Sequence, residues 1–298
     1  MTLPAPPPHL REALEYVFGA AGSDWLDQLP RLLATLVDQW DLELDHALSE
    51  GQMSYCASGV ERSSGSAIVL KASPSPATAT REIDALEYWA GRGTPRVLHS
   101  DPARGAFAMQ RILPGTPWRR HNEPKDEQVL TLLRELHRAP AEPPRSALTF
   151  RENVNLRASW ADERFADPSC RQQRRDLELA RAAFAYLHAT ALRIVLLHGD
   201  FQGKNVLHGT DGLVTIDPLP TIGDPQFDQV FWCVKHHEPW GIAKRVGSLN
   251  RGHATDRQRL MLWAWSIAAL ERRDYDEHIS EIVGFLDTYR DLVVAEVP

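Results

Sequence analysis

The spacing of hydrophobic residues changes twice along the chain, first from a helical to an alternating pattern and then back to a helical one. Residues 1–8 are rich in proline and are expected to be disordered. Two stretches with apolar residues at helical spacing follow, and Leu29, Leu33, Leu36 and Trp40 form a stripe along the second of them. The two helices are predicted over residues 9–20 and 23–40.

Short segments rich in β-forming residues occupy most of the next part of the chain. The first three are separated by turn-forming stretches and predict an antiparallel meander. A helix that ends near Gly91 is predicted after the third strand. The pattern therefore predicts a small antiparallel sheet of about five strands with one internal helix. The predicted strands are residues 42–49, 54–61, 67–73, 96–102 and 105–113, and the predicted helix is residues 76–93.

A Pro/Gly-rich break, LPGTPW, marks the predicted boundary between an N-lobe of residues 1–111 and a C-lobe of residues 112–298. Beyond the break, apolar residues recur mostly at helical spacing, which predicts a larger and mostly helical lobe. The fold class is therefore expected to be α+β with two lobes. The predicted helices of the C-lobe are residues 126–138, 171–190, 256–273 and 276–295.

The segment LLHGDFQGKNVLHG, which begins at Leu196, interrupts this helical lobe with a dense polar stretch between apolar ends. Polar groups in such a place must satisfy one another or be satisfied by a ligand, because burying them unpaired costs free energy. A turn at Thr210–Gly212 predicts that NVLHG and LVTID pair as a hairpin. Because a hairpin brings its outer ends together, Asn205 and Asp217 are expected to be neighbours, with Asp200 close to both. Two carboxylates and an amide oxygen suit Mg²⁺.

The spacing of this cluster matches the catalytic-loop pattern of kinases, H-x-D-x-x-x-x-N, followed by an Asp at the end of the next strand. His198, Asp200, Asn205 and Asp217 fill its four places. A phosphate-binding P-loop is excluded, because its pattern needs more residues between the glycines and a hydroxyl residue after the lysine. A polar loop satisfied by its own backbone is the competing interpretation. The order of a β-rich lobe followed by a helical lobe favours the kinase site.

A phosphoryl-transfer site of this kind also needs a lysine on the third strand and a glutamate on the next helix. Lys71 lies near the end of the third predicted strand. Glu82 shares the apolar stripe of the following helix with Ala85, Leu86 and Trp89, so it is expected to face the sheet. A carboxylate there must be paired, and Lys71 is the available cation. Glu87 lies off that stripe and is expected to be solvated.

Two further nucleotide contacts are predicted from position in the chain. Backbone N–H groups of residues 51–54, from Gly51 to Ser54, are expected to reach a phosphate, although G-x-G-x-x-G is absent from this turn. The backbone from Gln110 to Ile112 precedes the lobe boundary and is the candidate adenine-binding edge.

These motifs resemble those of the aminoglycoside and hydroxyurea phosphotransferases, a family that includes the streptomycin kinases. The resemblance covers nearly the whole chain and rests above all on HGD-x4-N followed by IDP-x-P-x-x-GDP-x-x-D. It implies a protein-kinase-like fold and transfer of the γ-phosphate of ATP to a hydroxyl of a small molecule. It also implies that Asp200 is the catalytic base, that Asn205 and Asp217 hold Mg²⁺, and that Lys71, positioned by Glu82, binds the α- and β-phosphates.

The same catalytic-loop pattern groups His198 with Asp200 as a catalytic residue, and the resemblance implies that Asp228 braces this loop rather than touching substrate. One departure is Lys204, which stands where the family usually has glycine. Its side chain is expected either to face solvent or to reach the γ-phosphate.

The acceptor is assigned by resemblance alone. By resemblance it is an aminoglycoside of the streptomycin type; the alternatives are a kinase of another small metabolite and a non-catalytic ATP-binding protein. Carboxylates after the WAWSIAALE segment could receive a cationic acceptor or form a solvated helix end, and one of Trp263 and Trp265 could line the pocket while the other packs in the core. The carboxylates are Glu271, Asp274, Asp276 and Glu277. A protein substrate is not expected, because the segment that would dock a peptide is missing.

Composition and charge agree with such an enzyme. The net charge of -7 argues against nucleic-acid binding. Cys56, Cys170 and Cys233 form neither a disulfide framework nor a zinc motif, which favours a reducing, cytoplasmic setting. No signal peptide is expected at the N-terminus, and no segment is apolar enough to span a bilayer.

Overall fold

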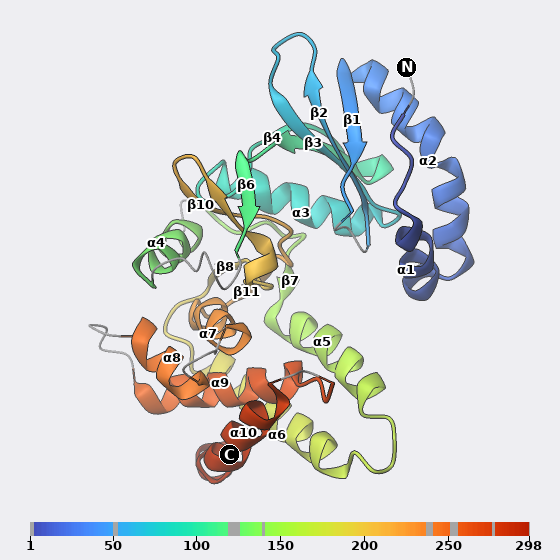
Figure 1. Ribbon diagram of the computed structural model, residues 1–298. Helices are drawn as coiled ribbons and strands as arrows, with labels where there is room; N and C mark the ends of the chain where they lie inside the picture. The colour runs from blue at the N-terminus through green and yellow to red at the C-terminus, as the bar shows by residue number, and fades with distance from the viewer. Residues whose placement is uncertain are drawn as a thin grey trace. The chain divides into compact units, whose positions relative to one another are not determined.

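The computed structural model divides the chain into two compact units, Met1–Gly115 and Thr116–Pro298. Figure 1 follows the order of their elements from blue to red. The predicted boundary, between residues 111 and 112, lies four residues before this division, and the structure forms a short strand, β6 (Pro114–Pro117), within the Pro/Gly-rich break. The structure describes residues 3–49, 53–118, 126–138, 141–236, 241–250, 256–275 and 278–297.

The first unit is a five-stranded sheet in the order β1-β2-β3-β5-β4, with every neighbouring pair antiparallel. The predicted meander and the internal helix α3 are both present. Ser75 caps α3 by accepting a hydrogen bond from the Thr78 N–H, and Pro76 occupies the first turn, where a missing N–H is harmless. The elements are α1 (Pro8–Phe18), α2 (Ala20–Gln39), β1 (Leu42–Ala47), β2 (Tyr55–Glu61), β3 (Ala67–Ala72), α3 (Pro76–Trp89), β4 (Val97–Asp101) and β5 (Ala106–Gln110).

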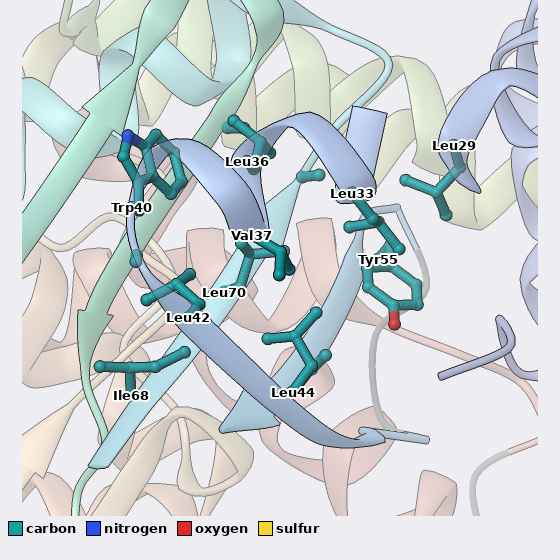
Figure 2. Packing of buried hydrophobic residues seen from close by; sticks show 14 of the residues in the cluster. Leu29, Leu33, Leu36, Val37, Trp40, Leu42, Leu44, Tyr55, Ile68 and Leu70 are labelled. Atoms are coloured by element: carbon teal, nitrogen blue, oxygen red, sulfur yellow. The ribbon is translucent and has the colours of Figure 1, made fainter. Parts of the chain in front are cut away.

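The core of the first unit lies between helix α2 and the sheet. The predicted stripe of α2 is buried and packs with side chains of β1, β2 and β3. Figure 2 shows Leu36 and Trp40 from the helix end facing Leu42, Ile68 and Leu70 from the strands. Burial of such side chains stabilises the fold by roughly 1.5–3 kcal/mol each.

The expectation of a disordered start is wrong for the described residues 3–8. Leu3 packs against the same core, and the Tyr55 hydroxyl donates a hydrogen bond of 2.8 Å to the carbonyl of Pro4. Pro8 itself begins α1. Proline-rich composition alone misled here, because an extended segment can dock on a preformed apolar surface at a small cost in entropy.

The second unit is mostly helical and holds two small sheets, β10-β9-β6 and β7-β11-β8. The four helices predicted by periodicity are present, and the sequence missed α5, α7 and α8. The elements are α4 (Asp126–Leu136), β7 (Leu148–Thr149), α5 (Phe150–Arg164), α6 (Arg171–Ala189), β8 (Val195–Leu197), β9 (Val206–Gly209), β10 (Gly212–Thr215), β11 (Thr221–Gly223), α7 (Gln226–Lys235), α8 (Ile242–Leu249), α9 (Arg257–Glu271) and α10 (Ile279–Glu296).

Helix α9 forms the centre of the second unit. It contacts α5, α6, α7, α8 and α10, and every residue from Leu260 to Leu270 is buried. Trp263 donates to the Gln226 side chain and Trp265 to the Leu286 carbonyl, and both indoles are fully buried. The expectation that one of these two tryptophans lines a pocket is therefore wrong, because the helix is covered on all its faces rather than on one.

The cysteines and the apolar character of the helices agree with the predictions from sequence. All three cysteines are free. No helix in the described part of the chain combines the length and the apolar character needed to cross a bilayer.

Candidate active site

The hairpin of β9 and β10 is formed as predicted. Gly209 pairs with Gly212 and Val206 with Thr215 in an antiparallel ladder. The Ile216 N–H donates to the Asn205 carbonyl at 2.9 Å and extends the ladder by one step. Asp217 follows directly and is exposed, with a backbone φ of 56°. The two ends of the hairpin therefore meet at one edge, which brings Asn205 and Asp217 into the same neighbourhood.

Asn205 is bound to Asp200 across the loop. Its amide nitrogen donates to the Asp200 carbonyl and to the Asp200 Oδ2, both at 2.9 Å. A short 3₁₀ turn, Gly203–Asn205, folds the chain back far enough for this contact. Because both amide hydrogens are used, the amide oxygen Oδ1 of Asn205 is the atom that remains for a cation.

Asp228 braces the catalytic loop by binding its backbone, as the resemblance implied. Its fully buried carboxylate accepts hydrogen bonds from the backbone N–H groups of His198 at 2.8 Å and Gly199 at 2.9 Å. It also contacts the His137 ring at 2.9 Å. A charged acceptor of this kind fixes the backbone of the residues that precede Asp200.

The ring of His198 is enclosed by the loop. Its Nε2 lies 3.0 Å from the Ile216 carbonyl, and its Nδ1 accepts from the Asp200 N–H at 3.3 Å. The side chain is fully buried, and burial lowers its pKa despite the nearby carboxylates. The neutral His198 ring therefore positions the loop through these contacts. The sequence analysis had instead grouped His198 with Asp200 as a catalytic residue.

Gly199 is required at the bend between these two residues. Its φ is 74°, in the region that favours glycine, and a Cβ atom there would lie 2.0 Å from the Leu219 carbonyl oxygen. The close approach of the two chain segments explains why the motif has glycine between its histidine and aspartate.

Arg157 is the residue of this site that the sequence analysis missed. It lies on α5 and donates to Asp200 Oδ1 at 2.9 Å and to the Gly199 carbonyl at 2.6 Å. Helix α5 has no clear apolar stripe, since its buried face includes Asn153 and Arg157 themselves. One signal was present: Thr149 and Glu152 form a capping box, a spacing that predicts a helix start.

The electrostatic surroundings of Asp200 favour its charged form. Burial acts to raise the pKa of this carboxyl group, but the charges of Arg157 and Lys204 and the hydrogen bonds outweigh it. The pKa of Asp200 therefore lies below its ordinary value. Gln202 also donates to both carboxylate oxygens, at 2.8 and 2.9 Å.

The departure at Lys204 has a structural context. Gly203, just before it, is packed so closely that a Cβ atom would lie 2.3 Å from the Trp118 ring and 2.8 Å from the His236 ring. The Gly203 N–H donates to the His236 Nε2 at 2.7 Å. The Lys204 side chain is 64% exposed, with its Nζ 3.8 Å from Asp200 Oδ2. Of the two expectations for Lys204, exposure to solvent is what this structure shows.

The nucleotide-binding candidates lie in the first unit. Lys71 and Glu82 form the predicted pair, with the Lys71 Nζ 2.8 Å from Oε1 and 2.7 Å from Oε2 of Glu82. Both side chains are buried, whereas Glu87 is exposed. Ser54 is buried, with its hydroxyl 3.9 Å from the Cys56 sulfur. Gly51 lies outside the described residues.

The predicted adenine edge is only partly available. The Gln110 N–H donates to the Arg96 carbonyl at 2.8 Å, and the Arg111 N–H donates to the Ala67 carbonyl at 3.0 Å. These two donors are therefore committed to the protein. Ile112, which is half-buried, remains as the candidate N–H donor of this segment.

Of the candidate acceptor carboxylates, Glu271 is not placed as the sequence suggested, whereas Asp274 is exposed, as the alternative of a solvated helix end predicts. Glu271 is the last residue of α9 and is bound by Arg157 at 2.7 Å and by Lys235 at 3.2 Å. Asp274 binds Gln173 and Arg272. Asp276 and Glu277 lie outside the described residues. Glu271 thus belongs to an internal charge network, because the cations that it pairs with come from the protein itself.

Comparison with solved structures defines the class of fold. The choline kinase LicA from Streptococcus pneumoniae superimposes with a TM-score of 0.61 at 12% sequence identity, over 90% of this chain and 99% of that chain. The aminoglycoside phosphotransferase APH(4)-Ia gives a TM-score of 0.58 at 17% identity, again over 90% and 99%. The protein therefore has the two-lobed protein-kinase-like fold.

Sequence comparison defines the family. Residues 39–276 match the family model described as aminoglycoside/hydroxyurea antibiotic resistance kinase. The chain is 30% identical to streptomycin 6-kinase of Streptomyces griseus over 279 residues, which is 89% of this chain and 88% of that protein. It is 28% identical to hydroxyurea phosphotransferase of Kitasatospora aureofaciens, over 82% and 72%. The chain belongs to the aminoglycoside/hydroxyurea antibiotic resistance kinases, and it is a small-molecule kinase.

Proposed function

We propose that this kinase transfers the γ-phosphate of ATP to a hydroxyl of an aminoglycoside of the streptomycin type. The observation that carries the proposal is the loop in which Asp200 is held by Asn205 while Asp228 fixes the backbone before it. Its similarity to streptomycin 6-kinase of Streptomyces griseus supports the choice of acceptor. The need for ATP and the three free cysteines support a cytoplasmic location.

Asp200 is proposed as the group that receives the acceptor hydroxyl. In this reaction the acceptor oxygen forms a bond to the γ-phosphorus, the bond from that phosphorus to the β,γ-bridging oxygen breaks, and ADP leaves. The hydroxyl proton passes to the Asp200 carboxylate and then to solvent. Since the pKa of Asp200 is lowered, its main contribution is to orient the hydroxyl, with proton transfer late. His198, Asp228 and Gly199 hold the loop.

Asn205 and Asp217 are proposed to hold Mg²⁺. The described residues contain no cluster of three His, Cys, Asp or Glu side chains that would form a closed metal site. One amide oxygen and one exposed carboxylate fit Mg²⁺, which keeps waters and takes phosphate oxygens as its other ligands. When bound, the ion neutralises the charge that develops on the phosphate oxygens.

The first unit is proposed to bind the rest of the nucleotide. Lys71, oriented by Glu82, contacts the α- and β-phosphates, and the Ile112 N–H binds adenine. The turn from Gly51 to Ser54 covers a phosphate through its backbone N–H groups. A nucleotide bound to a protein of this fold supports the assignment: a structure of APH(4)-Ia is a ternary complex with ADP and hygromycin B.

The test is a panel of acceptors assayed for ADP release, with mass spectrometry to detect one added phosphate. We expect turnover with streptomycin, none without an acceptor beyond slow ATP hydrolysis, and turnover lowered by about 10²–10⁴ in Asp200→Asn. Hydroxyurea is included because of the Kitasatospora aureofaciens relative. Turnover with hydroxyurea alone would replace the proposed acceptor but keep the reaction. ATP binding without turnover on any acceptor would support the non-catalytic alternative.

A further inference from the structure

A chain of alternating charges runs from the surface of α7 to the catalytic loop. Lys235 on α7 lies 3.2 Å from Glu271 on α9, and Glu271 lies 2.7 Å from Arg157 on α5. Arg157 in turn lies 2.9 Å from Asp200. The exposed fraction of the side chains is 22% for Lys235, 13% for Glu271, 4% for Arg157 and 17% for Asp200.

Arg157 is fixed on every side. Its Nε donates to the Asn153 side chain at 3.1 Å, one terminal nitrogen donates to Glu271, and the other donates to both Asp200 and the Gly199 carbonyl. The guanidinium carbon Cζ lies 4.7 Å from the centroid of the Phe231 ring. A guanidinium group held in this way has little rotational freedom left, so it can define the position of the carboxylate that it binds.

Among the described residues, the other partners of the Asp200 carboxylate belong to its own loop. Gln202, Lys204 and Asn205 lie within five residues of Asp200 and would move with it. Arg157 stands 43 residues away on a helix packed against α6 and α9. It is therefore the contact that ties the carboxylate to the rigid part of the second unit.

We infer that Arg157 is a positioning residue for Asp200, and that Glu271 and Lys235 orient Arg157 for this task. The inference rests on the proposed function of Asp200. Stability alone does not account for the network, because apolar residues of similar volume stabilise a buried site as well as an ion chain does. The ion chain ends on the carboxylate that is proposed to receive the acceptor hydroxyl, and it holds that group in one orientation.

The main experiment compares Arg157→Met, Arg157→Lys and Glu271→Gln with the wild-type enzyme. Arg157→Met removes the charge and the fork, and we expect kcat to fall about 100-fold with the KM for ATP changed by less than about twofold, since misplacement of a reacting group costs about this much. Arg157→Lys keeps the positive charge but lacks the planar guanidinium group, and its kcat should fall about 10-fold. Glu271→Gln keeps the shape of the side chain but holds Arg157 less firmly, and its kcat should also fall about 10-fold.

The split between kcat and KM separates positioning from structural support. In Arg157→Met the loss should fall on kcat, while the KM values for ATP and for the acceptor stay within about twofold, because Asp200 is misplaced and the binding groups are not. In Arg157→Lys the loss in kcat should be smaller. Arg290→Met is the matched control: Arg290 makes a bidentate pair with Asp176 between α10 and α6, with both contacts at 3.0 Å. This control should lower Tm while leaving kcat and both KM values unchanged.

A second measurement needs no turnover. In protein labelled with ¹³C-aspartate, the carboxyl resonance that disappears in Asp200→Asn should shift and broaden at fixed neutral pH in Arg157→Met relative to the wild type, because the carboxylate loses its fixed orientation. An unchanged resonance, or wild-type kcat in Arg157→Met, would overturn the inference. If the wild type turns over no acceptor, the proposed function fails while this resonance still reports the Arg157 contact. If Arg157→Met does not fold, Arg157→Lys and Glu271→Gln decide by the same two readouts.

Discussion

Asp228 and Arg157 hold the same residue by its two backbone groups. The Gly199 N–H donates to the Asp228 carboxylate at 2.9 Å, and the Gly199 carbonyl accepts from the Arg157 guanidinium at 2.6 Å. An anion from α7 and a cation from α5 therefore fix the two peptide units that flank the Gly199 Cα, directly before Asp200. Because charge-assisted hydrogen bonds are short and directional, these two groups hold the backbone that carries Asp200 in one position.

Asp228→Asn should disturb this arrangement although it changes little in shape. The new amide nitrogen would face N–H donors of His198 and Gly199, and one of these bonds would be lost. We expect a loss of about 2–4 kcal/mol in the free energy of unfolding and at least a 10-fold fall in kcat. Urea denaturation and steady-state kinetics measure the two effects. Unchanged stability would contradict the bracing role.

Asp200→Asn should leave nucleotide binding nearly intact and lower turnover by about 10²–10⁴, the usual range for a positioned proton acceptor. Calorimetric titration with ATP and an ADP-release assay check the two halves of this expectation. Wild-type turnover in the variant would show that another group receives the hydroxyl.

Asp217→Ala should weaken Mg²⁺-dependent ATP binding more than Asn205→Ala, because it removes a full negative charge. Asn205→Ala should in addition lower kcat, because it removes the two hydrogen bonds that hold Asp200. Binding of ATP at several Mg²⁺ concentrations, together with kinetics, distinguishes the two variants. Equal Mg²⁺ dependence in both variants and the wild type would rule out these residues as ligands.

Lys71→Ala should remove most of the activity, and Glu82→Ala should cost less because Lys71 remains but is poorly held. The double variant should be scarcely worse than Lys71→Ala, since residues that act as a unit are far from additive. Lys71→Arg should also fail, because a planar fork does not replace a compact ammonium group. Exposed Glu87 supplies the control, and Glu87→Ala should be close to neutral. Steady-state kinetics of the five variants test the pair.

Glu271 should make stability depend on pH in the acid range. Burial acts to raise its pKa, but Lys235 and Arg157 outweigh burial and lower the pKa from 4.5 to about 2. A lowered pKa contributes stability above the unfolded value, and this contribution is lost as the pH falls through the folded value. The pKa shift corresponds to about 3 kcal/mol. Between about pH 4.5 and 2, the wild type should therefore lose stability relative to Glu271→Gln, as thermal unfolding at several pH values would show.

The local part of the site was accessible from sequence. The hairpin that joins Asn205 to the neighbourhood of Asp217 follows from two short strands and a turn. The orientation of Glu82 toward the sheet follows from helical periodicity. The need to pair a buried carboxylate then selects Lys71 as its partner. These inferences succeeded because each depends on residues close together in the chain, whose geometry a regular helix or hairpin fixes in advance.

The long-range part required the tertiary structure. Arg157 and Glu271 meet across 114 residues, and no periodicity links them, since α5 buries polar side chains and α9 is apolar all round. The full burial of Trp263 and Trp265 likewise depends on how many helices pack around α9. Residue spacing determines which side chains share a loop or a helix face. The partner that a buried charge finds on another element depends on packing of the whole unit, because only then do distant groups leave water together and become one another's nearest counter-charges.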